Sequence, residues 1–306
     1  MADYSESVTD GVTLDILTGD RFKIAVNRKG AELISLAAKA PSGDWKGFLY
    51  RDGETAKPAS GWANHATVMG YYLHRLWQEH SDYRGHPIQG GNHGFLRAFA
   101  FDAPEVGENS LTYRVPADRV PRDFYPLRVS LALTYSLSER GVTLEFAFLN
   151  EEPALDAHVS FGLHPGFAVS SPLTAKLLLP PGVYARHMAP GNFLNGEIQE
   201  IRHDGGESPF PAADLEGSYI LGLAGVPERT LVIDDPVGGR RVSLDFSEAP
   251  YVTLWSDMHP FLCVEPCWGL PDSNPPTTFE NKPGIQVIAP GATLRRSFTI
   301  LPTILP

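Results

Sequence analysis

The stretch LRVSLALTYSLSERGVTLEFAF, residues 127–148, decides the fold class. Apolar side chains take every second position from Leu127 to Leu137, with shorter or polar residues between them. Residues 138–141 read as a turn, and the alternation resumes from Val142 to Phe148. A period of two is typical of a β-strand with one face in a core. Two such runs joined by a short turn predict an antiparallel hairpin.

The same pattern recurs along the chain, and this decides the architecture. Further alternating runs lie at residues 12–16, 22–26, 231–233, 242–246 and 294–300. Gly and Pro together account for 56 of the 306 residues, from 29 Gly and 27 Pro, and this composition fits many short strands and turns. We therefore expect an all-β protein, a large antiparallel β-sandwich, with residues 1–306 forming a single domain.

Two segments depart from this pattern. Ala66–His80 is the best helical candidate, although its aromatic and β-branched residues favour a helix only weakly. The polar stretch of residues 190–217 is rich in Pro and Gly, and similar strand patterns continue on both sides of it. We expect this stretch to be an excursion between strands and not a linker between domains.

Composition and charge exclude several classes of partner. The chain has 25 Lys and Arg against 36 Asp and Glu, a net charge of −11, which argues against nucleic acid. No apolar stretch approaches the ~20 residues of a membrane helix, so no membrane partner is expected. Residues 1–18 lack the features of a signal peptide, and the only cysteines, Cys263 and Cys267, cannot build a disulfide framework. These features together predict a cytoplasmic protein.

Three short stretches contain the residues that are candidates for chemistry. In GGNHGFLR, residues 90–97, glycines on both sides of His93 leave room for a ligand. In FGLHPGF, residues 161–167, His164 stands between aromatic residues and is held extended by the proline after it. In FLCVEPCWGLPD, residues 261–272, Glu265 ends an apolar run, and a carboxylate is seldom buried unless it is paired or functional.

The order of HGFLR, FGLHPGF and CVEPCWGLPD on an all-β chain resembles the aldose 1-epimerase (galactose mutarotase) family, in particular members with HGF-R and G-HP-F blocks. The resemblance implies a galactose mutarotase-like super-sandwich that needs no metal or organic cofactor. It also implies a small sugar as substrate and an isomerase that interconverts the α and β anomers of a free hexose.

The resemblance also implies roles for individual residues. His164 matches the general acid of the family and Glu265 its general base, while His93 matches a histidine that hydrogen-bonds the sugar near its ring oxygen. Arg75 falls where the family has an arginine that contacts the substrate. We expect Glu265 to be ionised at neutral pH and its charge to favour a protonated His164.

Further substrate-binding candidates come from the same stretches and from one departure. Arg97 ends the first motif, and Trp268 follows Glu265 in the third. Many relatives grip sugar hydroxyls with an aspartate just before a strand, but residues 215–221 contain no aspartate. Asp214 or Glu216 would have to take that role.

Three alternatives compete with an epimerase of a free hexose. A phosphorylated or modified sugar would be recognised by an arginine cluster, for which Arg84, Arg97 and Arg122 are available. A non-catalytic carbohydrate-binding protein could use the same aromatic-lined β-sandwich. A metal-dependent oxygenase ranks last, because the chain has no tight His-x-His or His-x-Asp/Glu motif.

Overall fold

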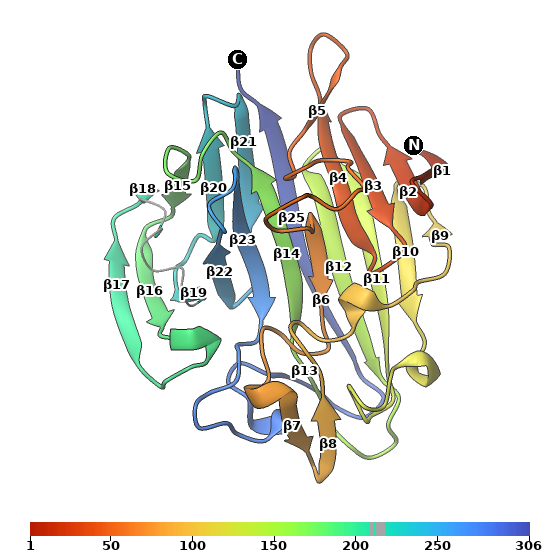
Figure 1. Cartoon of the computed structure of the whole chain (residues 1–306), viewed down its shortest axis with the longest axis vertical. Coiled ribbons are helices and arrows are strands. Elements are labelled where there is room, and N and C mark those ends of the chain that lie inside the picture. Colours follow the sequence, from red (N-terminus) through yellow and green to blue (C-terminus); the bar gives the residue numbers. More distant parts are fainter. Residues whose placement is uncertain (209–210, 212–217) are drawn as a thin grey trace.

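The computed structural model describes residues 1–208, 211 and 218–306, and within them nearly all regular structure is β (Figure 1). The hairpin predicted from residues 127–148 is confirmed as β11 (Val129–Ser138) paired antiparallel with β12 (Gly141–Asn150). Alternate side chains of both strands are buried in the core. The period-two pattern therefore marked the core face correctly.

One layer of the structure is a nine-stranded antiparallel sheet that contains this hairpin. Its order is β18 (Gly206–Ser208), β15 (Lys176–Leu179), β20 (Thr230–Asp235), β21 (Arg240–Asp245), β25 (Thr293–Ile304), β12, β11, β10 (Ser110–Val115) and β9 (Glu105–Val106).

The second layer consists of two antiparallel sheets. The five-stranded sheet runs β1 (Asp3–Thr9), β2 (Val12–Thr18), β3 (Phe22–Asn27), β4 (Glu32–Lys39) and β5 (Trp45–Gly47). The seven-stranded sheet runs β17 (Ile198–His203), β16 (Gly182–His187), β19 (Tyr219–Gly225), β22 (Tyr251–Trp255), β23 (Phe261–Trp268), β14 (Phe161–Ala168) and β6 (Ala66–Met69).

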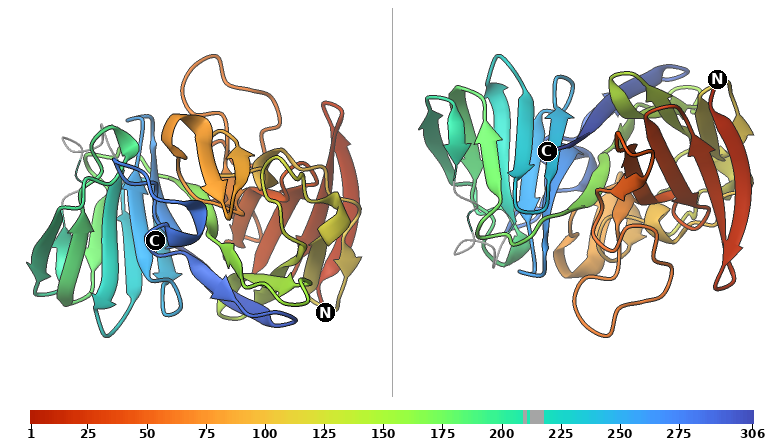
Figure 2. Two further views of the ribbon diagram at one scale, coloured as in Figure 1. Left: turned by 90° about the horizontal axis from the view of Figure 1, so that it is seen from below. Right: turned by 90° about the horizontal axis from the view of Figure 1, so that it is seen from above.

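Both sheets of the second layer pack on the nine-stranded sheet. Phe161 of β14 lies 4.7 Å from Phe148 of β12 between ring centroids, and the Tyr135 hydroxyl of β11 donates to the Ala31 carbonyl at 2.8 Å. One core cluster contains residues of all three sheets. In Figure 2 the N-terminal sheet, in red, and the strands β15–β19, in green to cyan, lie at opposite sides of the molecule. The expected antiparallel β-sandwich is confirmed.

The remaining described elements are short. Two small two-stranded sheets remain: the hairpin of β7 (His80–Tyr83) with β8 (His86–Gln89), and the pairing of the distant strands β13 (Ala157–Val159) and β24 (Gln286–Ile288). The single-turn 3₁₀ elements are η1 (Trp77–Glu79), η2 (Leu96–Ala98), η3 (Ala117–Arg119), η4 (Pro190–Asn192) and η6 (Phe279–Asn281). None of the helices in the described ranges is long and apolar enough to span a membrane.

Two expectations about local structure are wrong. Ala66–His80 is not a helix: it begins with the fully buried strand β6 and continues as a loop that ends at η1. The Thr and Val of β6 pair with β14, and this pairing overrides a weak helical preference. The stretch of residues 190–217 is not only an excursion, because it supplies β17 and β18 to the edges of two sheets. Edge strands can be polar on both faces, so they lack a clear alternation.

Candidate active site

Four polar side chains form a row across the seven-stranded sheet. Thr67 of β6 lies opposite His164 of β14, and Glu265 of β23 lies opposite Thr253 of β22. The register of β14 with β23 places His164 level with Glu265. Because successive side chains of a strand point to opposite faces, neighbours such as Val264 fill the core while this row lies on the outer face.

His164 and Glu265, the predicted acid and base, meet in this row. The Nε2 atom of His164 lies 3.4 Å from Oε1 of Glu265, and the two side chains are 12% and 2% exposed. Burial lowers the pKa of His164 to about 3 and raises the pKa of Glu265 well above its ordinary value. The expected ionised Glu265 and protonated His164 are therefore not what burial favours, since it penalises both charges. Transfer of one proton from His164 to Glu265 gives the uncharged form of the pair, which holds the same total number of protons.

Three buried polar atoms of the row have no hydrogen-bond partner among the described residues: Thr67 Oγ1, His164 Nδ1 and Glu265 Oε2. Buried polar groups are nearly always satisfied in folded proteins. Three such atoms in one row are therefore unusual for a structural core and are typical of a functional site.

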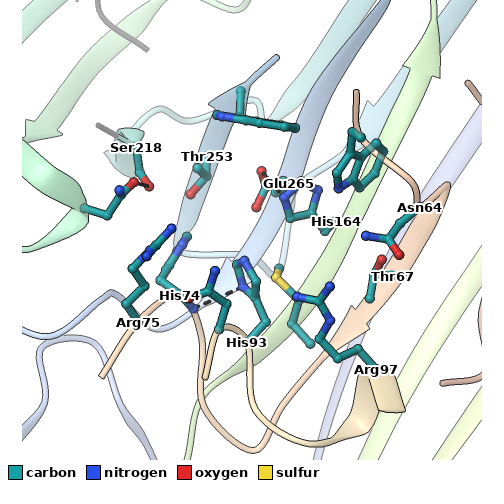
Figure 3. A pocket seen from close by; sticks show the side chains of 15 residues that line it. Asn64, Thr67, His74, Arg75, His93, Arg97, His164, Ser218, Thr253 and Glu265 are labelled. Carbon is teal, nitrogen blue, oxygen red and sulfur yellow. Dashed lines mark hydrogen bonds and ion pairs between the residues drawn. The ribbon is translucent and has the colours of Figure 1, made fainter. Parts of the chain in front are cut away.

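The row forms the floor of a pocket of about 270 Å³. In Figure 3 His164 and Glu265 lie at its centre, His93 lies below them, and Arg75 and Arg97 stand to either side. The described residues that line it are Trp62, Asn64, Thr67, Met69, His74, Arg75, Asn92, His93, Arg97, His164, Asn192, Ser218, Thr253, Trp255 and Glu265. Five of the predicted site residues, from four separate stretches of sequence, are thus brought to one pocket.

His93 is held by a loop that only a narrow set of residues can form. Its backbone N–H donates to the His74 carbonyl at 2.7 Å, and the His74 N–H donates to His93 Nδ1 at 3.2 Å. His93 has φ 64°, and a Cβ at the following Gly94 would lie 2.1 Å from the Gly70 carbonyl oxygen, so only glycine fits there.

The hydrogen bond to Nδ1 determines what His93 offers the pocket. Burial lowers the pKa of His93 well below its ordinary value, with a further contribution from His164, so the ring is neutral. Because Nδ1 accepts a hydrogen bond, the single ring proton is assigned to Nε2. Its ring centroid lies 5.4 Å from that of His164, and the ring can donate one hydrogen bond to a ligand beside His164.

Arg75 and Arg97 are the cations of the pocket. Neither guanidinium makes a hydrogen bond or ion pair with any residue of 1–208, 211 or 218–306. An arginine has five N–H donors in a fixed fork, which suits hydroxyl, carboxylate or phosphate oxygens. Both side chains are therefore available to a ligand.

A buried ion pair holds the segment that contains Arg75. Asp272 pairs with Lys282, and both side chains are 1% exposed. The Asp272 backbone N–H donates to the Arg75 carbonyl at 3.2 Å, and the Trp77 N–H donates to Asp272 Oδ2 at 2.7 Å. The Leu194 N–H donates to the Asp272 carbonyl at 2.9 Å. Asp272 therefore joins the segment that contains Arg75 to the segment that contains Leu194.

The aromatic walls of the pocket come from residues that sequence reasoning missed. The Trp62 ring stacks on His164 with centroids 4.9 Å apart, and Trp255 approaches His164 edge-on at 5.7 Å. Trp255 was detectable, because it lies two positions after Thr253 on the same face of β22. Trp62 lies in a loop before β6 and gave no periodic signal.

The prediction that Trp268 binds the substrate is wrong. It is fully buried in the core, its ring stacks on Phe161 at 5.1 Å, and its Nε1–H donates to the Glu248 carbonyl at 2.9 Å. The reason is its parity: three positions after Glu265 on one strand, its side chain points to the opposite face.

The other candidate residues fall outside this pocket or outside the described ranges. Arg84 and Arg122 do not line it, and the Arg122 guanidinium donates to the Pro126 carbonyl at 2.9 Å. Asp214 and Glu216 lie outside the described residues.

The family follows from a comparison with family models. The model of aldose 1-epimerases matches residues 14–179, more than half of the chain, and the match contains His93 and His164. This chain belongs to the aldose 1-epimerase family. Protein LacX of Lactococcus lactis subsp. lactis is 25% identical over 222 residues, which cover 68% of this chain and 73% of LacX.

Solved structures agree with this aldose 1-epimerase family fold. A galactose mutarotase-like protein from Lactobacillus casei superposes with a TM-score of 0.82 at 24% identity and covers 95% of this chain and 100% of its own. A galactose mutarotase related enzyme from Lactobacillus acidophilus gives 0.83 at 19% identity and covers 99% and 97%. At these identities the likeness establishes the fold, which is the expected galactose mutarotase-like sandwich.

In this family member the site residues also offer a set of metal-ligand atoms. His164, Cys263 and Glu265 each place one such atom within 4.8 Å of the others. Burial raises the pKa of the Cys263 thiol and of the Glu265 carboxyl well above their ordinary values. Metal binding would require the deprotonated forms of Cys263 and Glu265, and burial opposes both.

Proposed function

We propose that the protein is an aldose 1-epimerase that interconverts the α and β anomers of a free hexose. The observation that carries the proposal is the 3.4 Å separation of His164 Nε2 and Glu265 Oε1 at the floor of a sugar-sized pocket. Membership of the aldose 1-epimerase family supports it.

The chemistry needs one acid and one base on either side of the C1–O5 unit of the sugar. The reaction starts from the ionised pair, formed when the Glu265 proton passes to His164 Nε2, 3.4 Å away. Glu265 then takes the proton of O1–H, C1=O1 forms as the C1–O5 bond breaks, and His164 gives its Nε2 proton to O5. The aldehyde then turns about C1–C2, and closure reverses both proton transfers. The open-chain stage leaves both side chains neutral, which is the form that burial favours. No proton from solvent and no third catalytic group is needed.

The surrounding residues would orient the sugar. His93 would donate its Nε2–H near the ring oxygen beside His164, and the guanidiniums of Arg75 and Arg97, unpaired among the described residues, would donate to hydroxyls on either side. The Trp62 and Trp255 rings keep water from His164 and present apolar faces to the C–H groups of the ring. Orientation adds to acid–base catalysis because it places C1 and O5 before the reaction begins.

Polarimetry on freshly dissolved α-D-galactose or α-D-glucose tests the proposal. Glu265→Gln and His164→Asn should each lower the catalysed rate at least 100-fold, since a general acid or base contributes ~10²–10⁴-fold. The exposed Glu139→Gln and His86→Asn are matched controls and should keep wild-type rates. Wild-type rates in both site variants would overturn the assignment, and sugar binding with no acceleration by the native protein would indicate a carbohydrate-binding protein.

A second candidate is an anomerase of a phosphorylated or otherwise anionic sugar. It is favoured by the two guanidiniums of Arg75 and Arg97, which have no anionic partner among the described residues. A comparison of kcat/KM for a hexose and its 6-phosphate distinguishes the two. A large preference for the phosphate, lost in Arg97→Gln, would select the second candidate.

A further inference from the structure

Trp62, one of the aromatic walls of the pocket, belongs to the loop between β5 and β6. The loop comprises residues 48–65, and both of its ends are bonded to β14. The Tyr50 N–H donates to the Gly166 carbonyl at 2.7 Å, and the Gly166 N–H donates to the His65 carbonyl at 2.7 Å. These bonds fix the two ends of the loop and leave the position of Trp62 to contacts from elsewhere.

The turn between β22 and β23 supplies such a contact through Asp257. Asp257 Oδ2 accepts a hydrogen bond from the Trp62 backbone N–H at 2.8 Å, across 195 positions of sequence. The other oxygen, Oδ1, accepts from the His259 backbone N–H at 3.0 Å and lies 2.9 Å from His259 Nδ1. An aspartate that only caps a turn needs only the bond to the residue two positions on. The bond to Trp62 is therefore additional to what the turn requires.

His259 packs directly against the same loop. A Cβ at Gly61 would lie 2.7 Å from Cε1 of the His259 ring, and Gly61 has φ 81°, so both space and backbone favour glycine. The turn that carries His259 has its own internal bonds. The Ser256 hydroxyl donates to the Phe261 carbonyl at 2.8 Å and accepts from the Met258 N–H at 3.0 Å. The turn is therefore a firm support for the loop.

The Trp62 ring fills the space above the strand that carries the predicted acid. A Cβ at Gly166 would lie 2.4 Å from Cζ3 of the Trp62 ring, so the missing side chain makes room for the ring. Gly166 lies two positions after His164, on the same face of β14. The Trp62 ring stacks on His164 with centroids 4.9 Å apart and on Phe261 at 5.2 Å. The position of Trp62 therefore determines how dry and how fixed the His164 ring is.

We propose that Asp257 is a positioning residue for the epimerase reaction and that it acts by holding Trp62 against His164. The inference rests on the proposed function, which assigns His164 the role of acid. The hairpin of β22 and β23 then serves both catalytic groups: β23 carries Glu265, and the turn holds the cover of the neighbouring His164. His259 supports Asp257 from within the turn. Asp257 is not among the described residues that line the pocket, so its effect on the reaction is indirect.

Comparison of Asp257→Ala with Trp62→Ala tests whether Asp257 acts through Trp62. Asp257→Ala should lower kcat for monosaccharide anomer exchange by about 10–100-fold, because a small misplacement of a catalytic group can cost ~10²-fold. In a protein that already carries Trp62→Ala, it should cost nothing further, and the double variant should agree with Trp62→Ala within about twofold. Asp257→Asn keeps one acceptor oxygen, so it should recover part of the lost rate.

Titration of the His164 ring, followed by NMR, gives a second measurement that does not depend on catalysis. Burial lowers the pKa of His164 to about 3, so the native ring should not titrate between about pH 5 and 8. In Asp257→Ala water should reach the ring, and it should titrate in this range. The other titratable or charged groups beside His164 are unchanged in this variant: Glu265, Cys263, His74, His93 and Arg97.

Asp245→Ala is the matched control, because it removes a comparable bond to the Ser247 N–H two positions on and should change neither measurement. The proposal fails if Asp257→Ala leaves kcat and the His164 titration at native values, or if its effect adds in full to that of Trp62→Ala. If Asp257→Ala does not fold, Asp257→Asn takes its place in both comparisons. A shifted His164 titration, in a protein whose native form does not accelerate anomer exchange, would support the role of Asp257 in placing Trp62 and overturn the epimerase function. Native acceleration that neither Asp257 variant lowers would do the opposite.

Discussion

Asp272→Asn should strongly destabilise the protein and lower its affinity for sugar. The Asp272–Lys282 pair is 1% exposed on both sides, so the substitution leaves an ammonium group buried without its counter-ion. Loss of one partner of a buried pair costs about 3–5 kcal/mol, and the Trp77 N–H also loses a charged acceptor. Since the Asp272 side chain holds the Trp77 N–H, two positions after Arg75, its loss should loosen the segment that contains Arg75, and KM should rise more than kcat falls.

Urea unfolding and steady-state anomer exchange measure these two effects. The double variant Asp272→Asn/Lys282→Met removes the uncompensated charge and should recover most of the lost free energy of unfolding, because neutral replacement of a buried pair is often tolerated. Glu207→Gln, which breaks an exposed pair with Lys176, is the control and should leave the free energy of unfolding close to that of wild type. An Asp272→Asn protein within 1 kcal/mol of wild type, or a double variant as unstable as the sum of its parts, would refute the reasoning.

Three further predictions concern ionisation and cooperativity. Burial lowers the pKa of His74 and His164 to about 3 and that of His93 well below its ordinary value, and it raises that of Glu265. Between pH 4.5 and 6.5 the unfolded chain binds up to three more protons at the histidines and one fewer at Glu265. The free energy of unfolding should therefore fall with decreasing pH over this range, because the protons gained by the three unfolded histidines outnumber the one lost at Glu265; a flat profile in urea titrations would contradict this. Trp62→Ala should let water reach His164 and raise its pKa toward 6.5, which NMR titration of the ring measures; an unchanged pKa would show that the stacked ring does not cause the shift. Because one core joins all three sheets, calorimetry should give a single unfolding transition for residues 1–306, and two resolved transitions would contradict the single-domain expectation.

The architecture was predictable from the sequence wherever one face of a strand is buried. Alternation located β11, β12, β20, β21 and β25, because every second side chain of these strands enters the core. It did not locate β17 and β18, whose exposed edge positions carry polar residues on both faces. It also could not give the sheet order, since residues that pair with each other, such as those of β12 and β25, lie 144 to 158 positions apart.

The site was predictable only in part. His93, His164 and Glu265 stand in short motifs, and the structure brings them together. Strand parity, applied to Glu265, would have excluded Trp268, which lies three positions away on the same strand. No local signal indicated Trp62, because its position depends on a loop and on a hydrogen bond from its backbone N–H to Asp257, 195 residues away.

The buried ion pair of Asp272 and Lys282 also could not be predicted from the sequence. Asp272 and Lys282 read as ordinary charged residues of a loop, and their pairing behind Arg75 arises only when distant segments meet. The subgroup of the family suggested by the HGF-R and G-HP-F blocks stays a prediction.

A crystal structure of the Glu265→Gln protein with bound D-galactose or D-glucose tests the central claim most directly. We expect O5 within hydrogen-bond distance of His164 Nε2 and O1 beside the side chain of residue 265, with His93 and Arg75 in contact with the same ring. A sugar bound in this pocket with C1 turned away from both side chains, or no sugar there at saturating concentration, would contradict the account.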